Sequence, residues 1–151
     1  MKTIALDLMG GDKGPNEFLS AISIFLKENE NIKVIAIGDK NEIEVSIKND
    51  RFKFIHTDIQ IDKNNSIRKE LKKESSMKMA ISLVKDKKAD IVISSGDSGM
   101  YISLMTLILK RQEGVSRPAF AVMLPTFFEN KKVLFMDVGA NLEVRSNFLT
   151  E

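Results

Sequence analysis

Residues 4–15 read IALDLMGGDKGP, an apolar run that leads into a glycine-bearing turn. Every side chain from Ile4 to Met9 except Asp7 is apolar, which is typical of a parallel strand buried on both faces. Pro15 closes the turn, and proline is well tolerated in the first turn of a helix. The stretch therefore predicts a strand, a tight turn, and a helix that starts near Pro15 or Asn16.

The same unit recurs along the chain. Phe18, Leu19, Ile22, Phe25 and Leu26 form one apolar helix face after the first turn. Further strands are predicted at residues 33–38, 52–57 and 89–96, and further helices at 39–48, near 67–72, from Ser75 or Ser76 onward, and at 99–109. Strands that alternate with helices indicate an α/β fold with a mostly parallel sheet covered on both faces.

Two later segments complete the expected elements. Residues 119–124 and 132–138 are predicted strands, and the link between them is short enough for a hairpin or a tight connection. The helix at 99–109 is apolar nearly all round, so we expect it to be buried in the core or against a partner chain.

Composition excludes several classes of function. The chain has 151 residues, enough for one domain, and its 23 basic and 21 acidic residues give a net charge of +2. This near-balance argues against a dedicated nucleic-acid binder. Cysteine is absent, which excludes disulfides, thiolate metal sites and a cysteine nucleophile, and a single histidine excludes a multi-histidine metal site. We expect no metal and no cofactor.

The two ends of the chain carry further expectations. Met1 leads directly into a strand pattern without a signal peptide, and no apolar run is long enough to span a membrane, so we expect a cytoplasmic protein. The chain stops at Glu151, where an α/β unit should continue into a covering helix. We therefore interpret residues 1–151 as the N-terminal portion of a single domain.

Three turns follow apolar strands and share one predicted location, because ligands bind at the carboxyl ends of strands in such sheets. In the first, DLMGGDKGP, Gly10 and Gly11 allow a ligand to approach the backbone, and Asp7 and Asp12 flank them. The helix that follows offers free N–H groups to an anion such as phosphate. A tight turn without a ligand explains this motif equally well.

The second turn is SSGDSG, residues 94–99, in which Ser95 and Ser98 are candidate donors to phosphate or to an oxyanion. Its spacing is not that of a serine-hydrolase elbow, and a catalytic triad would require His56. The third turn is DVGAN, residues 137–141, where the amide of Asn141 could serve an oxyanion. Both aspartate and asparagine are also ordinary turn residues.

Basic side chains near these turns could clamp an anion. Lys73 and Arg117 are the candidates, and an arginine fork suits phosphate or the phosphopantetheine of an acyl carrier. A solvated surface charge is the plain alternative for either residue.

Five motifs in order carry a specific resemblance: DLMGGDKGP, KKESSM at 72–77, SSGDSG, SRPA at 116–119 and MDVGAN at 136–141. Together they resemble the phosphate acyltransferase family of bacterial phospholipid synthesis (PlsX), in its N-terminal half. The resemblance implies a three-layer α/β/α sandwich related to phosphotransacetylase and isocitrate dehydrogenase. It also implies acyl transfer from acyl carrier protein to inorganic phosphate, a homodimer, and peripheral association with the membrane.

The resemblance gives roles to the candidate residues. Asp7, Asp12 and Asn141 become catalytic candidates. The candidates for binding phosphate or substrate are Gly10, Gly11, Lys73, Ser95, Ser98 and Arg117. Phosphate itself would attack the thioester, so the protein needs no nucleophile of its own and must position the phosphate and stabilise the oxyanion.

The chain departs from the family pattern at Asp97, where the family usually has asparagine. Like charges about 4 Å apart repel by about 4 kcal/mol at an effective dielectric of about 20. Asp97 therefore points away from the phosphate, or is protonated, or weakens phosphate binding. Two alternative functions stay open: a phosphotransacetylase-like enzyme that uses acyl-coenzyme A, and a non-catalytic fragment that binds the carrier protein.

Overall fold

The computed structural model describes residues 1–12, 14–43, 47–115, 119–136 and 146. The chain divides into two compact units, Met1–Leu109 and Lys110–Glu151, and each is described by itself.

The first unit is built on a four-stranded parallel sheet. Its strands are β1 (Lys2–Asp7), β2 (Ile32–Gly38), β3 (Phe52–His56) and β4 (Ile91–Ser94), in the order β3-β2-β1-β4. Ile4 of β1 pairs with Val34 on one side and with Ile91 on the other, both in parallel register. The chain therefore leaves β1 toward β2 and β3 and later returns to its opposite side, which makes the β1–β4 boundary the switch point of the sheet.

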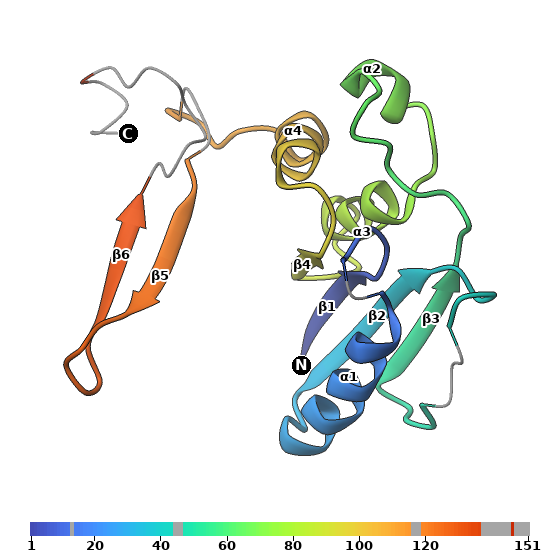
Figure 1. Cartoon of the computed structure of the whole chain (residues 1–151), viewed down its shortest axis with the longest axis horizontal. Coiled ribbons are helices and arrows are strands. Elements are labelled where there is room, and N and C mark those ends of the chain that lie inside the picture. The colour runs from blue at the N-terminus through green and yellow to red at the C-terminus, as the bar shows by residue number, and fades with distance from the viewer. Residues whose placement is uncertain (13, 44–46, 116–118, 137–145, 147–151) are drawn as a thin grey trace. The chain divides into compact units, whose positions relative to one another are not determined.

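Helices cover both faces of this sheet, which confirms the predicted three-layer arrangement (Figure 1). On one face, α1 (Asn16–Glu28) buries Leu19 and Ile22 against Leu6 of β1. On the other face, α3 (Ser76–Lys85) places Ala80 against Ala5 of β1. Successive residues of β1 point to opposite faces, so Asp7 lies on the same side as Ala5 and faces the start of α3.

The helix α4 (Ser98–Leu109) packs beside α3 rather than inside the sheet layers. Met100 and Leu104 are buried against Met77 and Ile81 of α3, whereas Leu107 is 52% exposed. The expected burial of this nearly all-apolar helix is therefore met on one side only within this unit. A short helix, α2 (Ile67–Glu70), confirms the weaker prediction near 67–72.

The predicted helix at 39–48 is wrong for the residues that the structure describes there, 39–43 and 47–48. Asp39 forms a turn instead. Its carboxylate accepts a hydrogen bond from the amide of Asn41 (2.8 Å), and its carbonyl accepts one from the amide of Glu42 (3.2 Å). Aspartate side chains compete in this way with helical hydrogen bonds of the backbone, which the apolar pattern alone does not reveal.

The second unit holds an antiparallel pair, β5 (Ala121–Pro125) and β6 (Lys132–Met136). Of the two predicted connections, the structure has the hairpin. The pair forms a two-stranded sheet of its own. The Oγ1 of Thr126 closes the hairpin by accepting from the amide of Phe128 and donating to the carbonyl of Lys131.

Candidate functional site

The turns after β1 and β4 touch each other through glycine. Gly10 has φ +88°, and a Cβ atom placed on it would lie 3.1 Å from the Cα of Gly96. A Cβ on Gly96 would lie 2.7 Å from the Cε of Met77. The 3.1 Å distance at Gly10 is tighter than an ordinary contact, so a side chain there would require the backbone of Gly96 to shift by a few tenths of an ångström. The structure thus brings the first two predicted turns to one place at the switch point.

A second close approach joins the same turns one residue further along. A Cβ on Gly11 would lie 2.8 Å from the Oγ of Ser95. That Oγ is buried and has no hydrogen-bond partner among the residues that the structure describes. Buried hydroxyls are normally paired, so an unpaired one at a glycine turn is a candidate ligand contact.

A pocket of 410 Å³ opens where the two turns meet, at the carboxyl ends of β1 and β4. We call it the crevice. Its lining residues come from the two turns, the segment before α2 and the start of α3: Asp7, Met9, Gly10, Gln60, Ile61, Asp62, Lys63, Asn64, Ser76, Met77, Gly96 and Asp97. Open parallel sheets bind their ligands at this location.

Asp7 forms the floor of the crevice and is 1% exposed. Its carboxylate accepts hydrogen bonds from the Oγ of Ser94 (2.6 Å) and the amide of Met9 (3.1 Å). Burial raises the pKa of Asp7, and hydrogen bonds from Ser76, Ser94 and the Met9 amide oppose that rise without cancelling it. A buried carboxyl with a raised pKa at a pocket floor is a frequent mark of a functional site.

Asp97 caps the N-terminus of α4. Its Oδ1 accepts a hydrogen bond from the amide of Met100 (2.8 Å), and its carbonyl accepts one from the amide of Tyr101 (2.9 Å). The positive end of the helix dipole stabilises this carboxylate. Asp97 also lines the crevice. Its hydrogen bond to the amide of Met100 occupies a donor that would otherwise be free for an anion.

The predicted site residues fall on two sides of the glycine contact. Asp7 and Gly10 line the crevice, whereas Gly11, Asp12 and Ser95 line a separate hollow of 460 Å³ against α1. Two further candidates line neither. Ser98 is exposed at the first residue of α4, and the Nζ of Lys73 donates to the Oε1 of Glu70 (2.7 Å). Arg117 and Asn141, with the whole third turn, lie outside the described residues.

Comparison with known proteins decides the family. The model of a family described as "Fatty acid synthesis protein" matches residues 2–151. The chain belongs to this family. A phosphate acyltransferase of Mycoplasma mobile is 41% identical over 152 residues, which cover 100% of this chain and 46% of the relative. One of Mycoplasmopsis pulmonis is 42% identical over 152 residues, which cover 100% of this chain and 47% of the relative.

These matches confirm the resemblance to the phosphate acyltransferases. The chain spans about half the length of the curated relatives it matches. Among solved structures, a branched-chain phosphotransacylase from Enterococcus faecalis V583 superimposes with a TM-score of 0.53 at 20% identity, over 93% of this chain and 44% of that one. This likeness supports the fold and nothing more.

Sequence reasoning missed one wall of this phosphate acyltransferase-family crevice. The sequence predicts only a short helix near residues 67–72 in this region, yet Gln60 to Asn64 line the crevice. Ser76 also lines it, although its motif was recognised only as a helix start and a family mark. The signal that could have found Ser76 is its place in KKESSM; residues 60–64 have no comparable pattern.

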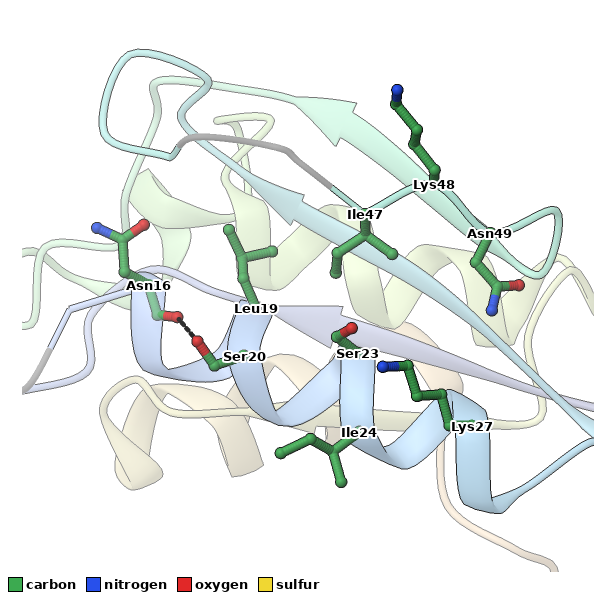
Figure 2. Close-up of a pocket in the computed structure, with 9 residues that line it drawn as sticks. All are labelled: Asn16, Leu19, Ser20, Ser23, Ile24, Lys27, Ile47, Lys48 and Asn49. Carbon is green, nitrogen blue, oxygen red and sulfur yellow. Dashed lines mark hydrogen bonds between the residues drawn. The ribbon is translucent and has the colours of Figure 1, made fainter.

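Another pocket, of 530 Å³, lies between α1 and residues 47–49, away from the strand ends (Figure 2). None of the predicted site residues lines it. Figure 2 shows its serines on the helix, and the Oγ of Ser20 donates to the carbonyl of Asn16 within the same helix (3.4 Å). Its position on the flank of α1 sets it apart from the glycine turns, so we assign it no part in the family's chemistry.

In the part of the chain that the structure describes, no group of acidic, histidine or cysteine side chains could hold a metal ion. Nor does any helix among those residues have the length and apolarity to cross a membrane. His56 is engaged at the end of β3, where its Nδ1 accepts from the amide of Lys40 (3.2 Å).

Proposed function

We propose that the complete protein transfers a fatty acyl group from acyl carrier protein to inorganic phosphate, as a step of phospholipid synthesis. An oxygen of phosphate attacks the thioester carbonyl carbon. The carbon–sulfur bond then breaks, and the thiolate of the carrier leaves and takes up a proton. The products are an acyl phosphate and the free carrier protein.

The contact between Gly10 and Gly96 carries this proposal. It keeps side chains out of the space at the switch point, so a ligand can approach the backbone of both turns. A small anion held in the crevice would meet the ends of two strands and the start of α3 at once. Positioning of this kind can supply several kcal/mol of a reaction barrier without a nucleophile from the protein.

Phosphate as the attacking group requires no nucleophile from the protein. The chain has no cysteine. The Oγ of Ser94 donates to the carboxylate of Asp7 (2.6 Å) and accepts from the amide of Gly96 (3.1 Å), and these two bonds hold Ser94 at the floor of the crevice. We assign Asp7 and Ser94 to shaping the crevice. Ser95 and Ser98 remain candidate donors to phosphate or the oxyanion.

The test is acyl phosphate formation by the complete protein, trapped with hydroxylamine as the hydroxamate. Formation must depend on added phosphate; carrier release at the same rate without phosphate would contradict the proposal. Acyl-coenzyme A at equal concentration tests the phosphotransacetylase-like alternative, which predicts the higher rate with that donor. Calorimetric binding of carrier protein without any turnover would favour the non-catalytic alternative.

On the family resemblance, we extend the proposal to the oligomeric state of the protein and to its location in the cell. The protein acts as a homodimer in the cytoplasm and associates peripherally with the inner face of the membrane. Size-exclusion chromatography with light scattering tests the dimer, and sedimentation with anionic vesicles tests the association. A monomer, or a protein that stays in the supernatant, would contradict the respective part.

A further inference from the structure

The crevice has an unfavourable charge balance for phosphate. Its lining holds the carboxylates of Asp7, Asp62 and Asp97, and Lys63 is the one cation among the described residues that line it. Phosphate sites need positive charge or hydrogen-bond donors directed at the oxygens. The position of Lys63 therefore matters more than that of any other basic residue in this unit.

Lys73, the lysine favoured from the sequence, is paired with a buried glutamate. Its Nζ donates to the Oε1 of Glu70 at 2.7 Å, and Glu70 is 0% exposed. Removing Lys73 from this pair would leave a carboxylate buried without its counter-charge, which is costly. Lys73 thus supplies the counter-charge of Glu70 and is not among the described residues that line the crevice.

Lys63 is in the opposite situation. Its side chain is exposed and lines the crevice, and within the described part of the chain its Nζ has no hydrogen bond or ion pair. Gln60 stands beside it on the same wall, and the Nε2 of Gln60 lies 3.4 Å from where a Cβ of Gly10 would be. This wall thus places the Gln60 amide beside the glycine contact and includes Lys63 in the lining of the same crevice.

A network of hydrogen bonds holds that wall in place. The carboxylate of Glu70 accepts from the Nδ2 of Asn65 (2.8 Å) and from the amide of Asp62 (3.4 Å). Asp62 in turn accepts from the amide of Asn64 (2.9 Å) and from the Nδ2 of Asn65 (3.2 Å). Residues 62–65 are therefore tied to a buried anchor on both sides of Lys63.

We propose that Lys63 is the cation that binds phosphate in the crevice and that Glu70 is the positioning residue that holds the Lys63 segment there. The inference rests on the proposed function, because it takes phosphate as the ligand. It adds two residues that neither the sequence motifs nor the family resemblance singled out.

The first experiment compares K63Q and K63R with K69Q in the complete protein. Lys69 lies nearby on α2, is exposed and does not line the crevice, which makes it the matched control. We expect the KM for phosphate to rise about tenfold in K63Q with kcat within about twofold, as for loss of one charge contact worth about 1.4 kcal/mol. K63R should restore most of the affinity, and K69Q should behave as the parent.

Glu70 is tested by E70Q and E70A. The single amide oxygen of glutamine can accept from Asn65 or from the Asp62 amide but not from both, so E70Q keeps part of the network and should raise the KM for phosphate less than E70A does. Thermal melting shows whether either variant is folded; if E70A is not, E70Q and K63Q still decide. A role of Glu70 in stability alone predicts a lower melting temperature with an unchanged KM.

An unchanged KM for phosphate in K63Q would overturn the inference, while phosphate-dependent turnover in the same assay would leave the proposed function standing. If the parent protein forms no acyl phosphate, the proposed function fails. Calorimetry with inorganic phosphate then tests the inference by itself: parent binding that K63Q loses supports it, and equal binding contradicts it.

Discussion

The Oγ of Ser94 donates a 2.6 Å hydrogen bond to the carboxylate of Asp7, across the boundary between β4 and β1. The two residues are register partners at the ends of these strands. Their bond joins the first and second glycine turns at the floor of the crevice. It also gives the buried carboxylate a donor that it needs, because a buried charge without partners is strongly unfavourable.

Loss of this bond should destabilise the fold. S94A leaves one oxygen of Asp7 without its donor, and we expect the free energy of unfolding to fall by about 1–3 kcal/mol. S20A is the matched control, since Ser20 is exposed and bonds only to its own helix; its effect should stay within about 0.5 kcal/mol. Urea denaturation measures both, and equal effects would contradict this account.

The ionisation of Asp7 should make stability depend on pH. Its pKa in the folded state is raised by burial, so the native state binds a proton more readily than the unfolded state does. Stability from this group is therefore highest at acidic pH and falls as pH rises through the raised pKa. D7N cannot titrate, so the parent should lose stability relative to D7N as pH increases above about 4. Melting temperatures of both proteins between pH 4 and 8 measure this; parallel curves would show that Asp7 does not titrate differently on folding.

Gly10 should be required for two reasons: its φ is positive, and it lies in close contact with Gly96. Gly10 and Gly14 both have positive φ, but a Cβ on Gly14 would meet nothing within 4 Å. G14A should cost about 1–2 kcal/mol for its backbone conformation. G10A carries the same cost plus the clash with Gly96, so it should be clearly less stable than G14A and should lose phosphate-dependent activity. Chemical denaturation with an activity assay separates the two; equal losses would mean that the turns are not in close contact.

The charge of Asp97 should oppose phosphate binding. D97N keeps a side-chain oxygen to accept from the amide of Met100 and removes one negative charge from the crevice lining. We expect the KM for phosphate to fall by about threefold to tenfold, and the change should shrink at high salt because screening weakens the repulsion. Steady-state kinetics at two ionic strengths provides the check. A KM that rises would mean that the carboxylate assists binding.

Local patterns were enough to predict the sheet and the meeting of two turns. The run from Ile4 to Met9 is apolar because β1 is buried between helices on both faces, and Gly10 and Gly96 are glycines because their backbones touch. The segment around Lys63 could not be predicted in this way. Its position depends on Glu70, a buried charge whose partners are side chains and a backbone amide of the same polar loop. At Asp39 the apolar pattern predicted a helix that the structure does not have. The carboxylate of Asp39 accepts a hydrogen bond from the amide of Asn41 and forms a turn there instead.

We propose that phosphate attacks the acyl carbon in this crevice. The most direct measurement supplies phosphate labelled with ¹⁸O at every oxygen and analyses the intact acyl phosphate by mass spectrometry. The account predicts a product that keeps all the labelled oxygens, because phosphate forms the new bond to carbon through its own oxygen. A product that has lost one label would show that the acyl group first became a carboxylate and was phosphorylated afterwards, and it would contradict the account.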